Sequence, residues 1–292
     1  MSNIGLIIPE READIGNFLV GRLLPFRSRR SVGPFVFIDH MGPVKLGPNE
    51  NLDVAPHPHI GLATLTFLFE GAIMHRDSLG TELEIVPGAV NWMTAGKGVV
   101  HSERTPERLR GESKNLHGLQ IWVALPKHLE DSSPTFQHVE ANDIPTWTEK
   151  GINFKLIAGK FSDKESPVAV HSDMYFIEIH SEKDVQVDIG DQLYGESALY
   201  ILEGSIETEG NTFGTKQILV AKEANLCSFL LTANSTVYIF GGSPFEEERH
   251  IFWNFVHSNK DKIEAAKEDW KAQRFDKVPN EVGFVPLPIP KK

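Results

Sequence analysis

Short apolar segments separated by glycine or proline recur along most of the chain, and this rhythm constrains the fold more than any other feature. In the first half we expect strands at residues 64–70, 72–77, 82–86, 89–94, 99–103 and 117–125. In the second half we expect strands at 152–158, 174–180, 185–189, 198–203, 205–209, 216–220, 227–231 and 236–241. Many short strands at this spacing are typical of a sandwich or barrel. The sequence therefore predicts an all-β protein.

The two series of strands resemble each other. Residues 66–71 and residues 199–204 are both strand-like and both end in Glu-Gly. Aligning Glu203 on Glu70 without gaps predicts a duplicated β-domain. The first half has polar residues at positions 57, 59, 101 and 103 that could bind a metal. On this alignment the second half has Gly190, Gln192, Asn234 and Thr236 at the corresponding positions. None of these is a strong metal ligand, so we expect a metal site in the first copy alone.

The length of 292 residues also favours two domains. We expect a first domain at residues 1–140 and a second at 141–292, joined through a polar, proline-bearing linker at 126–151. Residues 41–55 are predicted to be a loop. A helix is expected at 259–274, where Ser258 and Asp261 have the spacing of a capping box. A proline-rich extended tail follows, which we expect to fold back across the first domain.

Composition excludes several classes of function. The formal net charge of −11 argues against direct binding to nucleic acid, which requires a basic surface. Cys227 is the sole cysteine, so an intramolecular disulfide is excluded. The sequence has no signal peptide and no long apolar run, so we expect a soluble, cytoplasmic protein without a membrane partner. A nuclear location is also open if the source is eukaryotic.

Two pairs of polar residues stand out between residues 56 and 104. His57 and His59 are two apart, as are His101 and Glu103, so each pair lies on one face of a strand. If these strands meet inside a barrel, three imidazoles and one carboxylate converge. Such a mixed nitrogen and oxygen set predicts a site for one divalent metal ion. The residue types suit Fe(II), Mn(II), Ni(II), Cu(II) or catalytic Zn(II), and spacing does not choose among them.

Several motifs carry a family resemblance. They are FIDHMGP at residues 37–43, HPHIG at 57–61, HRDS at 75–78, WMTAGKGVVHSE at 92–103, FWNFV at 252–256 and AKEDWK at 266–271. Together they resemble the pirin family of the cupin superfamily, over nearly the whole chain. The resemblance implies a bicupin of two tandem double-stranded β-helix (jelly-roll) barrels. It also implies one mononuclear iron, most readily Fe(II), held in the N-terminal barrel by the four residues named above.

The sequence departs from the family pattern at one position. Pirins usually have Phe-Glu-Thr after the His-x-His-x-Gly segment, whereas this chain has Leu62-Ala63-Thr64. Ala63 can neither bind a metal nor accept a proton, so any role of that glutamate in relatives is unfilled here.

Four further residues are candidates either to contact the metal ligands or to line the pocket. Asp39 and His40 could lie at the mouth, although a turn stabilised by Asp39, Gly42 and Pro43 is the better explanation. His75 lies on one face with Asp77, which suits either a contact behind the ligands or a surface hairpin. Met93 alternates with Trp92, so only one of the two can line a cavity.

Two functions follow from the resemblance. The first is an iron-dependent dioxygenase similar to quercetin 2,3-dioxygenase, taking a flavonol and O2, with Glu103 as both ligand and base. The second is a non-catalytic regulatory protein that binds a protein partner according to the iron oxidation state. Isomerase or hydrolase chemistry with another metal is a third reading, because a cupin fold does not fix the reaction.

Overall fold

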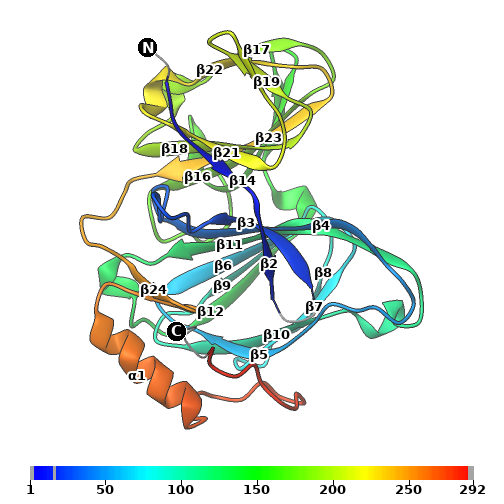
Figure 1. Ribbon diagram of the computed structural model, residues 1–292, viewed down its shortest axis with the longest axis vertical. Helices are drawn as coiled ribbons and strands as arrows, with labels where there is room; N and C mark the ends of the chain where they lie inside the picture. Colours follow the sequence, from blue (N-terminus) through cyan, green and yellow to red (C-terminus); the bar gives the residue numbers. More distant parts are fainter. Residues whose placement is uncertain (1–2, 16–17, 289–292) are drawn as a thin grey trace. The chain divides into compact units, whose positions relative to one another are not determined.

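The computed structural model describes residues 3–15 and 18–288, and it divides into two compact units (Figure 1). We call the unit with residues 13–20, 39–138 and those from Glu246 onward the N-terminal barrel unit. The C-terminal barrel unit holds the residues up to Glu12 together with 21–38 and 139–245. The chain passes between the units within β2 (Arg11–Asp14), β3 (Leu19–Leu24) and β4 (Phe35–Leu46).

The N-terminal barrel unit is built from antiparallel strands. A four-stranded sheet has the order β5-β10-β7-β8, and β12-β9-β6-β11 are neighbours in a larger sheet. The strands are β5 (Asp53–His59), β6 (Leu62–Glu70), β7 (Ile73–Asp77), β8 (Glu82–Ile85), β9 (Val90–Thr94), β10 (Val99–Arg104), β11 (Lys114–Ala124) and β12 (Thr135–Val139). A separate hairpin pairs β24 (His250–Phe252) with β25 (Phe255–His257).

The C-terminal barrel unit repeats this plan. Its larger sheet has the order β1-β21-β18-β23-β16-β14-β13, with β15 beside β14, and its smaller sheet has the order β17-β22-β19-β20. The strands are β1 (Ile4–Pro9), β13 (Thr146–Glu149), β14 (Ile152–Phe161), β15 (Lys164–Glu165), β16 (Met174–Ser181), β17 (Val185–Asp188), β18 (Glu196–Glu203), β19 (Ile206–Thr208), β20 (Asn211–Phe213), β21 (Gln217–Ala221), β22 (Ser228–Leu231) and β23 (Ser235–Gly242). The predicted all-β fold is confirmed.

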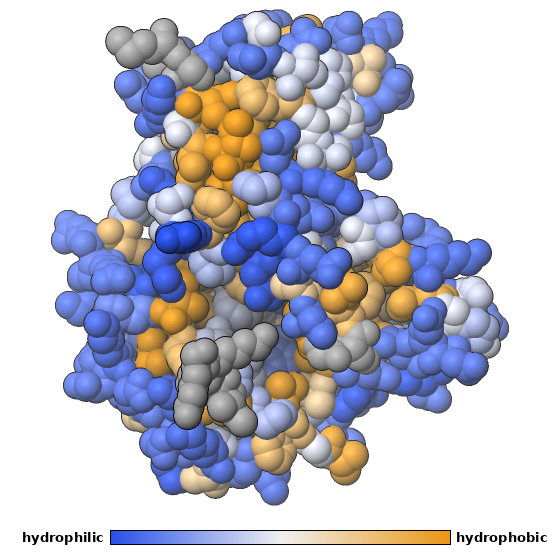
Figure 2. Space-filling view, in the orientation of Figure 1, coloured by the Kyte–Doolittle hydropathy of each residue, from blue (hydrophilic) through white to orange (hydrophobic). Residues whose placement is uncertain are grey.

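Each unit has its own apolar core. In the N-terminal barrel unit, Leu68, Ile73, Ile85 and Leu116 are buried together between strands of its two sheets. In the C-terminal barrel unit, a larger cluster of branched aliphatic and aromatic side chains includes the fully buried Ile177. The face drawn in Figure 2 is mostly hydrophilic, as expected of a chain with 24% charged residues.

The predicted linker at 126–151 contains the point, between His138 and Val139, where the chain passes from one unit to the other, but it also contains two strands. β12 and β13 each lie at the end of a sheet, and each begins directly after a proline, Pro134 or Pro145. An edge strand tolerates a missing N–H and exposes polar side chains, so its sequence resembles a loop. The predicted loop at 41–55 is also too long: β4 continues to Leu46, which is buried, and β5 begins at Asp53.

The single α-helix of the described residues, α1 (Lys260–Lys271), is shorter than the predicted 259–274. Its cap is Asn259, whose side chain accepts the Asp261 N–H at 2.8 Å, and not Ser258 as the spacing predicted. Ser258 instead donates its N–H and hydroxyl to the buried carboxylate of Glu130. The predicted apolar stripe is confirmed, since the three residues buried in the helix are Ile263, Ala266 and Trp270.

The tail after α1 folds back over the N-terminal barrel unit, as expected. The Val285 N–H donates to the Pro56 carbonyl at 2.9 Å, and Glu281 accepts from Ser102 and Arg104. By their contacts, the helix and the tail therefore belong to the N-terminal barrel unit. The expected division near residue 140 had placed both of them in the second domain. Residues 289–292 of the expected tail lie outside the described residues. Within residues 3–15 and 18–288, no helix has the length and apolar character to cross a membrane.

Short 3₁₀ helices connect several of the strands. They are η1 (Glu107–Leu109), η2 (Lys127–Leu129), η3 (Ala141–Asp143), η4 (Gly190–Gln192) and η5 (Ala224–Leu226).

Candidate metal centre

Three histidines come together because two neighbouring strands bring them to one place. β5 pairs with β10 in antiparallel register, with His57 directly opposite His101 and His59 opposite Val99. Because side chains two apart share a face of a strand, His59 points to the same side as His57. All three imidazoles are buried, and one nitrogen of each lies within 4.8 Å of the others. Sequence spacing predicted this convergence.

The distances between the rings fit a shared ion. The Nε2 atoms of His59 and His101 are 3.0 Å apart, and the His57 and His101 ring centroids are 4.3 Å apart. Two nitrogens bound at right angles to one ion, each about 2.1 Å away, would lie about 3.0 Å apart. Among the described residues, these three are the only histidine, cysteine or acidic side chains grouped closely enough to hold a metal.

The protonation of the three rings also suits metal binding. Nδ1 of His57 donates to the Ala55 carbonyl at 2.9 Å, which leaves the lone pair on Nε2. Burial lowers the pKa of His57 to about 4, and burial and then the charge of His57 lower the pKa values of His59 and His101 well below 6.5. Neutral imidazoles are the form that coordinates metals.

His59 differs from its partners in its outer nitrogen. Its Nδ1 is buried and has no hydrogen bond of normal geometry within the described residues, although the Asn254 carbonyl lies near enough to oppose the lowering of its pKa. A buried polar atom without a partner is costly in a folded protein. Binding of a metal at Nε2 would fix Nδ1 as the protonated nitrogen, facing that carbonyl.

Glu103 is not part of the three-histidine group in this structure. The register between β10 and β5 shifts between His101 and Glu103, and Glu103 lies opposite His75 on β7. Burial raises the pKa of Glu103 to about 7, and no charge or hydrogen bond contributes to the rise. Its place as a fourth ligand therefore stays a prediction. The sequence could not show the shift in register, because that depends on how β10 pairs with two different strands.

Behind His101 lies a chain of hydrogen bonds through His75 and Asp77. The two Nδ1 atoms of His101 and His75 are 3.4 Å apart, and Nε2 of His75 is 3.1 Å from Oδ2 of Asp77. Burial tends to raise the pKa of Asp77, but hydrogen bonds from His75 and Thr81 outweigh it and the net shift is downward. His75 and Asp77 are both buried, which excludes the surface-hairpin alternative for these two side chains.

The other candidates around the ligands fall in different places. Asp39 and His40 are both buried, and Nε2 of His40 lies 2.8 Å from Nε2 of His117. Burial, and then the neighbouring His40, lower the pKa of His117 to about 4. Sequence spacing predicts only a structural role for His117, because no ligand-spaced partner precedes or follows it. Its partner lies 77 residues away on another strand, which local spacing cannot reveal.

Met93 belongs to an apolar cluster. It packs with Ala95, Val99 and the half-buried Phe136, while Trp92 donates its Nε1–H to the Thr94 hydroxyl. Ala63 is fully buried on β6, where it lies opposite Thr94 and Val123.

The C-terminal barrel unit offers a contrasting interior. β22 is the counterpart of β10, because each pairs with two strands of the smaller sheet of its unit. The ungapped alignment, which put Asn234 and Thr236 at the positions of His101 and Glu103, is therefore wrong: Asn234 lies in a turn and Thr236 on β23. A single offset fails because the second-half strands are joined by segments of different length.

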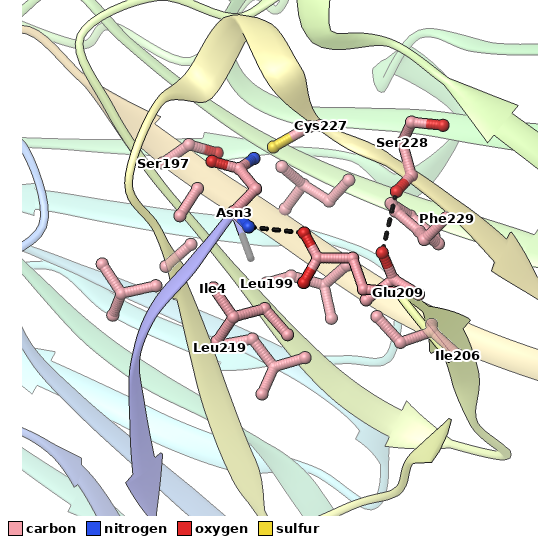
Figure 3. Close-up of a pocket in the computed structure, with 15 residues that line it drawn as sticks. Asn3, Ile4, Ser197, Leu199, Ile206, Glu209, Leu219, Cys227, Ser228 and Phe229 are labelled. Atoms are coloured by element: carbon pink, nitrogen blue, oxygen red, sulfur yellow. Dashed lines mark hydrogen bonds between the residues drawn. The ribbon is translucent and has the colours of Figure 1, made fainter. Parts of the chain in front are cut away.

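A small pocket of this unit opens between β18, β21 and β22 (Figure 3). Apolar side chains such as Leu199, Leu219 and Phe229 make most of its wall. Its one carboxylate, Glu209, accepts the Asn3 backbone N–H at 2.5 Å, and burial raises the pKa of the Cys227 thiol. This wall lacks the imidazoles of the other unit.

Two β-barrel units in one chain, one of them with a buried group of three histidines on paired strands, define the class of two-barrel cupin proteins. The family model described as pirin matches residues 17–123, and the model described as pirin C-terminal cupin domain matches residues 176–276. The chain therefore belongs to the pirin family, as its motifs predicted.

Relatives match this chain over nearly its full length. A pirin-like protein of Caulobacter vibrioides is 44% identical over 98% of this chain and 99% of its own length. The crystal structure of a quercetin 2,3-dioxygenase from Acinetobacter baumannii is 33% identical, with a TM-score of 0.88, and the match covers 98% of this chain and 95% of that chain. A pirin from Escherichia coli in complex with nickel(II) is 19% identical, with a TM-score of 0.64 over 82% of this chain and 99% of that chain, a likeness of fold alone.

Proposed function

We propose that this protein holds one divalent metal ion in the N-terminal barrel unit and uses it to oxidise a flavonol such as quercetin with O2. The observation that carries the proposal is the buried group of three neutral imidazoles at His57, His59 and His101. The likeness to a quercetin 2,3-dioxygenase over almost the whole chain supports the choice of substrate class.

The proposed ligand set is His57, His59, His101 and Glu103, with Fe(II) as the metal. Three nitrogens and one carboxylate leave positions open on an ion that prefers five or six ligands. Mn, Ni, Cu and Zn remain alternatives, because this ligand set accepts each of them and nickel(II) is present in the Escherichia coli pirin. Glu103 follows His101 by two residues on β10, and as a fourth ligand it would have to turn toward the three histidines.

The residues of the chain have distinct proposed tasks. The bound ion would supply a Lewis acid for the flavonol 3-hydroxyl and redox chemistry toward O2. Glu103, the acidic residue two positions after His101 on β10, would accept the proton of that hydroxyl at its carboxylate. The buried apolar wall around Met93 and Val99 would keep bulk water away from the reacting groups.

The decisive experiment is anaerobic loading of the purified protein with Fe(II), followed by oxygen uptake in the presence of quercetin. Oxygen consumption matched to loss of the flavonol absorption band, and absent in His101→Ala, is the expected result. The metal content of the same sample is measured in parallel. Protein that binds no metal would overturn the proposal.

A metal-dependent regulatory protein is the second candidate. Ala63 favours it, because the buried methyl group replaces the glutamate expected there and provides no base. One bound iron without any oxygen uptake would support this candidate, and a protein partner captured only by the Fe(III) form would establish it.

A further inference from the structure

The hydrogen bonds behind His101 fix which of its nitrogens can bind a metal. The chain of contacts starts at Asp77, which is fully buried at the end of β7. Oδ1 of Asp77 accepts the backbone N–H groups of Leu79 at 2.9 Å and Thr81 at 3.0 Å. These two bonds hold the carboxylate in one orientation within the β7–β8 hairpin.

The other oxygen of Asp77 decides the tautomer of His75. An ionised carboxylate only accepts hydrogen bonds, so Nε2 of His75, at 3.1 Å from Oδ2, carries the proton. A neutral His75 then has its lone pair on Nδ1. The ring of Phe136 stacks on His75 with a centroid distance of 4.8 Å and an interplanar angle of 29°, which limits rotation of the imidazole.

His75 in turn decides the tautomer of His101. Their Nδ1 atoms are 3.4 Å apart, and register places His101 directly opposite Asp77 on β7. Since Nδ1 of His75 is an acceptor, Nδ1 of His101 is the donor. The lone pair of His101 is then on Nε2, which faces Nε2 of His59 at 3.0 Å.

We propose that Asp77 and His75 are positioning residues that lock His101 in the tautomer able to bind the metal. This inference rests on the proposed metal site and deepens it. His57 is set differently, through the Ala55 carbonyl. Partners behind a metal-binding histidine typically change metal affinity about 10- to 100-fold.

The substitution Asp77→Asn tests whether Asp77 fixes the tautomer of His101, because it changes the hydrogen-bonding groups but hardly the shape of the side chain. The amide oxygen can still accept from Leu79 and Thr81, so the hairpin is retained. The amide nitrogen, however, donates to Nε2 of His75 and moves the His75 proton to Nδ1, where it opposes the proton of His101. We expect the dissociation constant for Zn(II), measured by competition with a chromophoric chelator, to rise about 10- to 100-fold.

Two further variants separate this role from a general loss of structure. His75→Phe keeps the stacking on Phe136 but removes the acceptor, and we expect a similar loss of affinity. Since both residues act through one path, the double variant should bind Zn(II) no more weakly than His75→Phe alone. Glu82→Gln is the control, because Glu82 lies exposed on the same hairpin and pairs with Arg76.

A direct readout is the ¹H–¹⁵N long-range NMR spectrum of the histidine rings, recorded on metal-free and Zn(II)-loaded protein. The expected spectrum shows a proton on Nε2 of His75 and on Nδ1 of His101 in both states. A doubly protonated His75, a proton on Nε2 of His101, or Zn(II) affinity in Asp77→Asn within twofold of the unsubstituted protein would overturn the proposal. If the protein bound no metal, the proposed function would fail, while the metal-free spectrum would still decide the tautomers.

Discussion

At the scale of single residues, the three histidines of the N-terminal barrel unit are buried and uncharged at neutral pH, with two Nε2 atoms 3.0 Å apart. A cation that binds only the folded protein stabilises it, by about 2.7 kcal/mol when present at 100 times its dissociation constant. We expect Fe(II) or Zn(II) to raise the midpoint of thermal unfolding by about 5 °C. Calorimetry with and without a chelator measures the shift. His57→Ala should abolish it, and the exposed His128→Ala should leave it intact.

Glu103 is the second residue with a specific expectation. Glu103→Gln keeps the shape of the side chain but removes the acceptor for the substrate proton, and loss of a general base typically costs about 10²- to 10⁴-fold in rate. We expect kcat for quercetin to fall by at least about 100-fold. Steady-state kinetics on iron-loaded protein with equal metal content gives the answer. A rate within threefold of the unsubstituted protein would assign the base to another group.

At the scale of elements, local pattern predicted the strands that have alternating or continuous apolar residues. β6, β7, β8, β9, β10 and β11 all occur within a few residues of their expected positions. The pattern missed β12 and β13, because edge strands need few apolar residues and their partners supply the other side of the ladder. The helix start was placed one residue early, since Ser258 binds Glu130 and Asn259 provides the cap.

In the site, too, local sequence pattern predicts some features, while others depend on the pairing of distant strands. A spacing of two residues along a strand is enough to identify His57, His59, His101 and Glu103 as candidate ligands. It could not show that Glu103 lies apart from the other three, or that His40 meets His117, because both depend on pairing between distant segments. Sequence pattern thus predicts what one strand presents, whereas register decides what two strands bring together.

A buried ionic network anchors the segment that leads to α1. The carboxylate of Glu130, with a 1% exposed side chain, contacts the Arg249 guanidinium at 3.0 Å and accepts from Ser258. Glu130→Gln would remove the buried carboxylate that faces Arg249 and leave the more exposed Glu247, at 3.5 Å, as its remaining ion pair. Because breaking a buried ion pair typically costs about 3–5 kcal/mol, we expect a loss of up to about that size. Urea unfolding should show this loss. Asp131→Asn is the matched control: Asp131 is 58% exposed and pairs with Lys262, so its replacement should cost less than about 1 kcal/mol.

At the scale of the whole molecule, the two barrel units follow one strand plan but differ in what they bury. The N-terminal barrel unit buries imidazoles on β5 and β10, whereas the C-terminal barrel unit has aliphatic and aromatic side chains around the corresponding β17 and β22. Apolar burial stabilises a barrel at any pH, but buried neutral histidines stabilise it only while they remain unprotonated. We therefore expect the stability of the N-terminal barrel unit to depend, through these histidines, on pH and on the proposed metal.

This difference predicts how the metal-free protein responds to acid. Burial lowers the pKa values of His57 and His117 to about 4, and those of His59 and His101 well below 6.5. Between about pH 6.5 and 4 these four histidines bind more protons in the unfolded chain than in the folded protein, so their contribution to the free energy of unfolding falls as the pH falls. Glu103, with its pKa raised to about 7, opposes this fall, but it is one group against four. The fall is about 1.4 kcal/mol per pH unit for each histidine held fully neutral. Above about pH 6.5 the contribution of these histidines to the free energy of unfolding no longer changes with pH.

Urea unfolding of chelator-treated protein between pH 7.5 and 5.5 measures this slope, at high salt so that the relief of the net negative charge adds little. The upper part of the window is chosen because carboxylates other than Glu103 titrate below it. His57→Gln should reduce the slope, and His128→Gln should not. Saturating Zn(II) should make the free energy at pH 7.5 larger and the decline with acid steeper, because bound metal is exchanged for protons at the same nitrogens. A slope that is flat in metal-free protein would mean that the folded state protonates these histidines as readily as the unfolded chain does.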